Sequence, residues 1–278
     1  MSDFTTDPMD ATRIERALDR SSWFRGKIHY YHSVDSTNTV ALAQAARGDP
    51  EASVYVADGQ LQGRGKLGRS WYSKPGAGIY ASILLRPNIE PRRIPLLTLL
   101  AAVVVVEAIA QVLQEAVRCE LMDNSPPALD IKWPNDVLLN GRKFCGILSE
   151  MVLLGNDTKH AVVGLGLNVH QDSFPPPLDV SATSLFIETG RHFGRADVLA
   201  AILKKFETWY IDFSQRRFDK VISRWSELST YAGGRNVTVE KEGRAISGVT
   251  RGLDRSGALL LERANGSIET IVAGEIFD

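Results

Sequence analysis

The sequence predicts an α+β fold: a mixed, mainly antiparallel sheet with packed helices, followed by a small β-barrel. Short β-branched runs joined by turn residues are separated from long helical segments, so we expect strands to pair through hairpins while the helices lie elsewhere. Asn140-Gly141 between two apolar runs is the strongest short-range hairpin signal in the chain. This order of elements argues against a doubly wound parallel sheet.

The first 86 residues divide into short elements. An arm at residues 1–27 carries three arginines at helical spacing, which we expect to form a solvated face (Arg13, Arg16 and Arg20). N-cap formers at 35–38 precede an Ala-rich helix that Gly48 ends. A β-branched strand at 53–58, a glycine-rich basic loop and an alternating strand ended by Pro87 follow.

The most apolar stretch of the chain, LLTLLAAVVVVEAIA, starts at Leu96. It contains Thr98 and is interrupted by Glu107, so it falls short of the roughly 18–20 residues that a membrane span needs. We therefore expect a buried core helix from about Pro95 to Val117 and no membrane association.

The second half begins with a strand at 129–139 that is interrupted at Trp133-Pro134, and a return strand follows the Asn140-Gly141 turn. Further expected elements are a turn at 155–157, a strand at 160–170, a Pro-rich loop at 172–179 and helical spacing over 195–228. Gly233-Gly234 marks a boundary before a run of short strands and Gly turns. The expected divisions are an arm (1–27), a catalytic domain (28–232) and a small barrel (233–278).

Composition limits the class of protein. The chain has 278 residues and a net charge of −1, which argues against a protein that coats DNA or another polyanion. Its two cysteines, Cys119 and Cys145, make neither a disulfide framework nor a metal-ligand spacing. The N-terminus lacks the apolar core of a signal peptide, so a reducing cytoplasm is the expected location.

The glycine-rich loop matches G-x-G-x-x-G at Gly63, Gly65 and Gly68, and nearly spells a P-loop. Both motifs require a helix to begin there, whereas a strand pattern follows, so we reject both. The loop's three cations repel one another unless an anion lies among them (Arg64, Lys66 and Arg69). Two interpretations stay open, a solvated basic loop and a site for phosphate plus carboxylate.

A second cluster surrounds the predicted hairpin. Asn135 and Asp136 stand at the proline-bent junction, and the return strand brings Lys143 close to it. Gly146 marks a place where backbone or ligand approaches closely, and the GLGLNV run adds two strand glycines and Asn168. A surface lysine is the alternative for Lys143. Together with the cationic loop, these signals suggest one shared face.

These motifs, in this order, resemble the biotin protein ligase family. The resemblance rests on DSTN (35–38), QLQGRGKLGRSW (60–71), KWPND (132–136), GRKFCGILSE (141–150), GLGLNV (164–169) and ATSL (182–185), with GALLLE and GEI near the end. It implies a catalytic domain like that of class II synthetases and of biotin and lipoate ligases, with an SH3-like C-terminal barrel. It also implies a two-step reaction, in which biotin and ATP with Mg²⁺ give biotinyl-5′-AMP and a lysine of a biotin carboxyl carrier protein then takes the biotin.

The resemblance also assigns roles, position by position. It places the ureido ring of biotin near Ser36, Thr37, Asn38 and Gln60, and the closing loop at Gly63, Arg64 and Gly65, with Gly146 nearby. It places Lys66, Arg69 and Lys143 at the carboxylate and phosphates as the catalytic cations. It assigns the nucleotide to Arg69, Trp71, Asn135, Asp136 and Asn168. Asp136 either orients the site or binds Mg²⁺ through water, and the sequence names no direct metal ligand.

The chain departs from the family pattern at two points. Lys66 stands where an arginine is often found, and a lysine lacks the planar bidentate fork of arginine, which puts the tight retention of the adenylate in question. Only about 27 residues precede the ligase-like core, too few for the N-terminal DNA-binding domain of repressor members, so we expect no DNA binding. Family members are commonly dimeric, so a homodimer is open.

Three other functions compete with this hypothesis. A lipoate or octanoate ligase shares the adenylate chemistry, but a dithiolane would leave the buried polar groups near Ser36 unpaired, at roughly 1–3 kcal/mol each. A non-catalytic biotin or nucleotide binder would have no turnover to lose when Lys143 is replaced. A DNA-binding regulator would show salt-dependent DNA binding.

Overall fold

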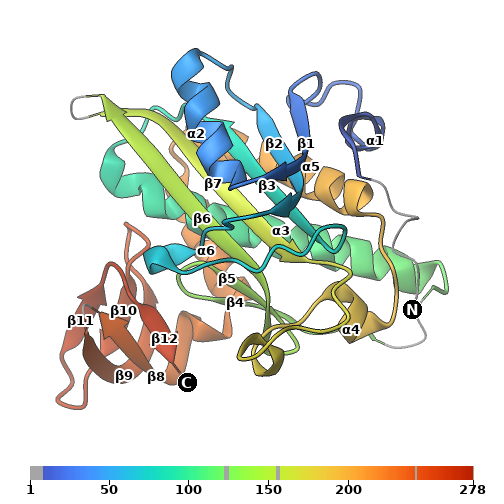
Figure 1. The fold of residues 1–278 in the computed structure, drawn as a ribbon. Helices are drawn as coiled ribbons and strands as arrows, with labels where there is room; N and C mark the ends of the chain where they lie inside the picture. The colour runs from blue at the N-terminus through green and yellow to red at the C-terminus, as the bar shows by residue number, and fades with distance from the viewer. Residues whose placement is uncertain (1–8, 122–124, 155–156, 242, 278) are drawn as a thin grey trace.

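A computed structural model of the chain describes residues 9–121, 125–154, 157–241 and 243–277. It contains a seven-stranded sheet in the order β1-β2-β3-β7-β6-β5-β4 and a five-stranded C-terminal sheet in the order β11-β10-β9-β8-β12 (Figure 1). In the larger sheet only β1 and β2 pair in parallel, and the other neighbours are antiparallel. The predicted α+β class with a mixed, mainly antiparallel sheet is confirmed.

Four strands of the large sheet, β4 to β7, follow one another directly along the chain, and helices lie before and after them. The strands are β1 (Ile28–Val34), β2 (Val54–Gln60), β3 (Gly78–Leu85), β4 (Leu129–Lys132), β5 (Asp136–Leu139), β6 (Arg142–Leu154) and β7 (Asp157–Asn168). The helices are α1 (Ala11–Ala17), α2 (Thr37–Arg47), α3 (Ile94–Arg118), α4 (Leu185–Thr189), α5 (Arg195–Ser214) and α6 (Phe218–Leu228). The C-terminal strands are β8 (Gly233–Lys241), β9 (Arg244–Leu253), β10 (Leu259–Glu262), β11 (Ile268–Ile271) and β12 (Glu275–Phe277).

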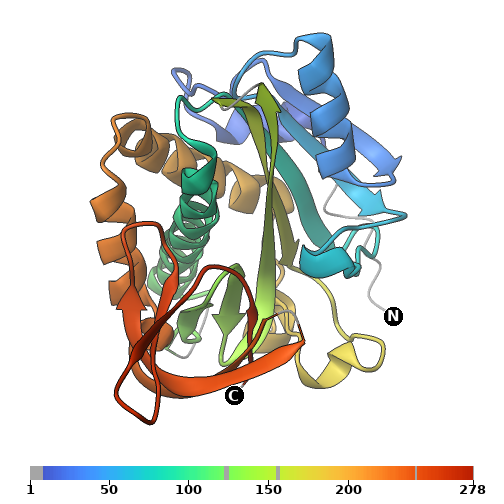
Figure 2. The same ribbon diagram turned by 90° about the vertical axis from the view of Figure 1, so that its left-hand side faces the viewer.

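The two faces of the large sheet are covered differently. Figure 2 shows α3, α5 and α6 on one side of the sheet and α2 on the other. The main core lies on the side of α3, and a small cluster around Ala41, Ala45 and Tyr55 lies under α2. Because α2 covers only part of its face, the rest of that face is left for a site.

Helix α3 covers Ile94–Arg118, close to the predicted helix from about Pro95 to Val117. By length and composition alone it could cross a membrane, which corrects the expected shortfall, and 72% of its most apolar window is buried inside the molecule. Glu107, which interrupts the apolar run, accepts hydrogen bonds from Trp209 Nε1 at 3.0 Å and Arg224 Nε at 2.8 Å. The polar interruption is therefore paired at the edge of the core, where α3 meets α5 and α6.

Several expected elements take a different form. Residues 129–139 make two antiparallel strands, β4 and β5, instead of one bent strand. Strand β1 was not predicted; it forms a β-α-β unit with α2 and β2. The helical spacing over 195–228 is divided by a break at Arg216, whose φ is 61°. The expected turn at 155–157 falls partly on residues outside the described ones.

The N-terminal arm packs against helix α5 and strand β1. Ile14 of α1 is fully buried, and α1 packs on α5. Glu207 of α5 accepts hydrogen bonds from Ser22 Oγ at 3.1 Å and from the backbone N–H of Trp23 at 3.2 Å. The arm therefore extends the core, while Arg13, Arg16 and Arg20 are exposed as expected.

The C-terminal sheet docks against α3 through one turn. Gly257, at φ 84°, offers its carbonyl to Trp133 Nε1 at 3.1 Å. A Cβ added to Gly257 would lie 2.7 Å from Leu99 Cδ1 and 3.0 Å from Leu96 Cδ2. A side chain would therefore force either the two leucine side chains or the docked turn to shift.

We expect Gly257→Ala to lower the free energy of unfolding by about 2–4 kcal/mol, because overpacking adds to the cost of a left-handed backbone. Gly266→Ala is the matched control: Gly266 has a similar φ of 80°, and a Cβ there would meet nothing within 4 Å. Denaturant titration of both variants isolates the packing contribution. Equal losses for the two would contradict the importance of this contact.

Candidate active site

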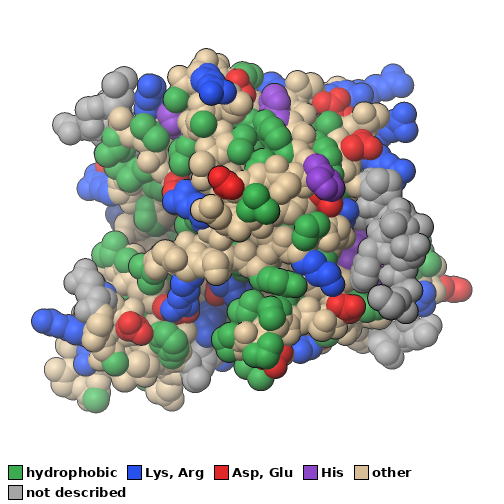
Figure 3. Space-filling view, in the orientation of Figure 1, with side chains coloured by type: hydrophobic (Ala, Val, Ile, Leu, Met, Phe, Trp, Pro, Cys, Tyr) green, Lys and Arg blue, Asp and Glu red, His purple; other side chains and the backbone are tan. Residues whose placement is uncertain are grey.

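A cavity of about 600 Å³ lies between the exposed sheet face, the loop after β2 and the C-terminal sheet. This volume suits a small-molecule ligand. Its lining includes seven cations and three carboxylates, in a chain whose net charge is −1, so positive charge is concentrated here. The cations are Arg64, Lys66, Arg69, Lys132, Arg142, Lys143 and Arg235, and the carboxylates are Asp130, Asp136 and Glu275. Figure 3 shows Lys and Arg side chains gathered in the hollow above the C-terminal sheet.

One end of the cavity is a neutral hydrogen-bonding network at the start of α2. Gln60 Oε1 accepts from the backbone N–H of Thr37 at 2.9 Å, and Gln60 Nε2 donates to Ser73 Oγ at 2.9 Å. Ser82 Oγ on β3 lies 2.8 Å from Thr37 Oγ1 and 2.6 Å from Asn38 Oδ1. Ser36, Thr37 and Asn38 are all buried. This end therefore offers fixed donors and acceptors without net charge.

Asn38 is committed to holding this end together. Its Nδ2 donates to Glu150 Oε2 at 2.8 Å and to the carbonyl of Leu148 at 3.2 Å. A Cβ on Gly164 would lie 2.2 Å from Asn38 Oδ1, so only glycine leaves room for this side chain. Arg64 Nη2 donates to the other oxygen of Glu150 at 2.7 Å. Glu150 thus ties the start of α2 to the glycine-rich loop.

The glycine-rich loop closes on itself as a narrow turn. The N–H of Trp71 donates to the carbonyl of Gly63 at 2.8 Å. The N–H of Gly65 donates to the carbonyl of Arg69 at 2.7 Å. Leu67 and Gly68 at the tip have φ of 57° and 75°. Gly63 of the loop lies outside the cavity lining, and a Cβ there would lie 2.5 Å from Trp71 O.

Trp71 lies on a floor made by two glycines. Gly146 of β6 and Gly166 of β7 are register partners, and a Cβ on either would lie 2.6 Å from the indole ring. Lys143 Nζ stands 5.5 Å from the centroid of the same ring. The indole Nε1 is buried, and no described protein atom accepts its hydrogen bond.

A β-bulge turns Lys143 toward the cavity. Val137 pairs with Cys145 and Leu138 with Lys143, so Phe144 is an extra residue on β6. Three-residue spacing on a regular strand would place Lys143 and Gly146 on opposite faces. The bulge places both on the cavity face, while Phe144 and Cys145 enter the core. The K-x-x-G spacing in the sequence is therefore a bulge signature.

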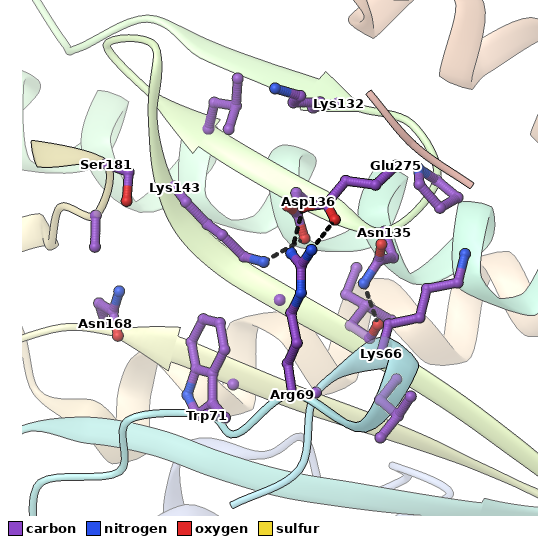
Figure 4. Close-up of a pocket in the computed structure, with 18 of the residues that line it drawn as sticks. Lys66, Arg69, Trp71, Lys132, Asn135, Asp136, Lys143, Asn168, Ser181 and Glu275 are labelled. Carbon is purple, nitrogen blue, oxygen red and sulfur yellow. Dashed lines mark hydrogen bonds and ion pairs between the residues drawn. The ribbon is translucent and has the colours of Figure 1, made fainter. Parts of the chain in front are cut away.

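Cations and carboxylates meet at the centre of the cavity (Figure 4). Lys143 Nζ lies 2.7 Å from Asp136 Oδ1, and Arg69 forms an ion pair with Glu275 of β12. Lys66 Nζ is 5.7 Å from the Trp133 ring centroid. Burial lowers the pKa of Lys66 below its ordinary value, although Asp136 and Glu275 oppose the shift. The centre therefore suits an anion that would share these cations.

Two amides at the edge of the cavity are bound to the backbone. Asn168 Nδ2 donates to the carbonyl of Thr183 at 3.0 Å, and Asn135 Nδ2 donates to the carbonyl of Ile147 at 2.9 Å.

In the described residues, no group of three or more His, Cys, Asp or Glu side chains comes together as a metal cage.

The structure brings the predicted site residues together, with Gly63 alone outside the lining. The residues in the lining are Ser36, Thr37, Asn38, Gln60, Arg64, Gly65, Lys66, Arg69, Trp71, Asn135, Asp136, Lys143, Gly146 and Asn168. Sequence reasoning missed Ser82, Glu150 and Glu275 as members of the site. The signal for Ser82 was a single serine among aliphatic residues of a buried strand, whereas Glu275 reaches the site only through the docking of the C-terminal sheet.

Comparisons with known proteins agree with this geometry. Residues 30–168 match the biotin/lipoate A/B protein ligase family, and residues 232–277 match the biotin protein ligase C terminal domain. The bifunctional ligase/repressor BirA of Bacillus subtilis is 38% identical over 249 residues, covering 88% of this chain and 72% of that protein. The biotin–[acetyl-CoA-carboxylase] ligase of Paracoccus denitrificans is 30% identical over 252 residues, covering 87% and 97%.

A solved structure is also similar to this chain. The biotin protein ligase of Aquifex aeolicus in complex with biotin and ATP superposes with a TM-score of 0.73 at 29% identity, covering 91% of this chain and 98% of that one.

The glycine floor can be tested through Trp71. We expect Gly166→Ala to push the indole off the sheet, red-shifting the tryptophan emission, because the added Cβ would lie 2.6 Å from the ring. Gly233→Ala is the control, since a Cβ at Gly233 meets nothing within 4 Å. The shift should vanish when Trp71→Phe is combined with Gly166→Ala. A shift that persists in the double variant would contradict this contact.

Proposed function

The chain belongs to the biotin/lipoate A/B protein ligase family, and from this premise we propose that it is an ATP-dependent biotin ligase. A carboxylate oxygen of biotin attacks the α-phosphorus of ATP, giving biotinyl-5′-AMP and releasing pyrophosphate. The ε-amine of an acceptor lysine then attacks the acyl carbon, loses a proton and releases AMP. The acceptor is the lysine of a biotin carboxyl carrier protein, by analogy with the Paracoccus relative named as an acetyl-CoA-carboxylase ligase.

One observation carries this proposal: the bulge at Phe144 sets Lys143 on the cavity face, where its Nζ meets Asp136 at the cationic centre. Biotin has a polar ureido ring at one end and a carboxylate at the other, which matches this division. Neither step requires a protein nucleophile, so the site has to position two anions and neutralise charge at phosphorus. Lys143 and the cations of the glycine-rich loop supply that charge.

The remaining roles follow from position. The fixed network of Thr37 and Gln60 supports recognition of the ureido ring, with Ser36 beside it. The Arg64–Glu150 pair supports a loop that closes over bound biotin. Trp71 and Asn168 lie together in Figure 4 and support the nucleotide.

Magnesium enters with ATP as part of the substrate. The 2.7 Å pair between Asp136 and Lys143 supports an orienting role for this carboxylate.

We place the reaction in the cytoplasm, in line with Cys119 and Cys145 as free thiols.

Pyrophosphate release tests the first half-reaction. We expect release from ATP-Mg²⁺ with biotin, and not with lipoate or octanoate, because a dithiolane offers no hydrogen-bonding partners to the network at Gln60. Lys143→Ala should lower kcat by about 10²–10³-fold through lost charge stabilisation. Lys220→Ala, which removes an exposed lysine paired with Asp212 on α5, is the control.

The outcomes separate the competing functions. Release with lipoate alone would make the chain a lipoate ligase. Biotin binding without release would make it a binding protein, and unchanged turnover in Lys143→Ala would contradict the role of that residue.

Retention of the adenylate is a separate prediction. Lys66→Gly should let biotinyl-AMP escape, because it removes a cation that lies over Trp133 at the centre of the cavity. The measurement is biotinylation of bystander proteins, read by streptavidin blot against the unaltered enzyme. No increase in stray labelling would remove Lys66 from this role.

A further inference from the structure

Lys143 lies on β6 beyond the last residue that pairs with β7. Strand β7 pairs with β6 only as far as Cys145, opposite Leu167. Beyond that point, residues 181–183 take the place of β7: the N–H of Lys143 donates to the carbonyl of Ser181 at 2.8 Å, and the N–H of Thr183 donates to that of Lys143 at 2.9 Å. The bulge and residues 181–183 therefore both position the backbone of Lys143.

A single carboxylate joins the segments on both sides of Lys143. Glu188 of α4 accepts hydrogen bonds from Asn140 Nδ2 at 2.7 Å, from Arg142 Nη2 at 2.5 Å and from Thr183 Oγ1. Its side chain is only 7% exposed. Asn140 and Arg142 belong to the turn and strand that lead into Lys143, and Thr183 belongs to the substitute strand.

Helix α4 holds this carboxylate in place. Ser184 caps the helix by accepting from the N–H of Ile187 at 3.0 Å, and Ser184 Oγ donates to the carbonyl of Gln171 at 2.6 Å. Burial raises the pKa of Glu188, but the hydrogen bonds from Thr183, Asn140 and Arg142 outweigh it and keep the pKa below its ordinary value. The group is therefore ionised at neutral pH, and its bonds to Arg142 and its neighbours are charge-assisted.

We propose that Glu188 is a positioning residue for adenylate formation: by tying Asn140 and Arg142 to Thr183, it fixes the backbone from which Lys143 reaches the reacting phosphate. The proposal rests on the role given to Lys143 above. A bulge lacks regular ladder hydrogen bonds and needs such support, since an error of about 1 Å at a catalytic group can cost about 10²-fold in rate. Glu188 also holds the guanidinium of Arg142, which lines the same cavity.

The test compares Glu188→Ala and Glu188→Gln with the unaltered enzyme. We expect Glu188→Ala to lower kcat for biotin-dependent pyrophosphate release by about 10–100-fold, with the KM for biotin changed less than about threefold, because the biotin end is held by other residues. Glu188→Gln keeps one acceptor oxygen and should recover part of the loss. Glu207→Ala is the matched control, because this carboxylate also accepts hydrogen bonds from two residues but secures the N-terminal arm.

A double variant separates positioning from general stability. In a Lys143→Ala background, measured under single-turnover conditions, Glu188→Ala should cause no further loss of rate, because the group it positions is gone. A further loss equal to that in the unaltered background would overturn the proposal, as would an unchanged kcat in Glu188→Ala. Failure of the proposed function would instead show as no biotin-dependent release by the unaltered enzyme.

Discussion

The site depends on a strip of sheet in which three glycines leave room for side chains from other elements. Residues two apart on a strand face the same way, so Gly164, Gly166 and Asn168 of β7 share the cavity face, with Gly146 beside them on β6. Asn38 fills the space above Gly164, and Trp71 fills the space above Gly146 and Gly166. Glycine weakens a strand, but these strands lie in the middle of the sheet and are paired on both sides. The paired backbone of β6 and β7 therefore sets how close the Asn38 side chain and the Trp71 indole lie to the sheet.

Cations at the centre of the cavity are paired with carboxylates that an anionic ligand can replace. Two of the central cations already have an anionic partner: Lys143 has Asp136, and Arg69 has Glu275. Like charges this close would otherwise repel, and the repulsion would fall on the glycine-rich loop. A phosphate or carboxylate that enters replaces an existing partner instead of meeting bare charge. This also explains why a chain of nearly zero net charge can concentrate cations in one place.

Local sequence signals predicted local structure well. Asn140 and Gly141 have φ of 48° and 78°, as the predicted tight hairpin turn requires, and the apolar run after Leu96 forms the core helix. Strand β1 escaped notice because its histidines and tyrosines lack clean alternation. The direction of Lys143 was beyond pattern reasoning, since a bulge changes which face a residue occupies without changing composition. Glu150, Glu188 and Glu275 were missed because each acts through a partner at least 46 residues away along the chain.

The C-terminal sheet is a wall of the cavity and not an appendage. Its strand β12 supplies Glu275, which pairs with Arg69 of the glycine-rich loop. Its Gly257 receives the Trp133 indole, whose ring also lies under Lys66. At the start of the sheet, the Arg235 guanidinium stacks 3.9 Å from the Tyr231 ring centroid, and both side chains line the cavity. Because loop and sheet hold each other through charge, a ligand that takes Arg69 from Glu275 would loosen this contact as it binds.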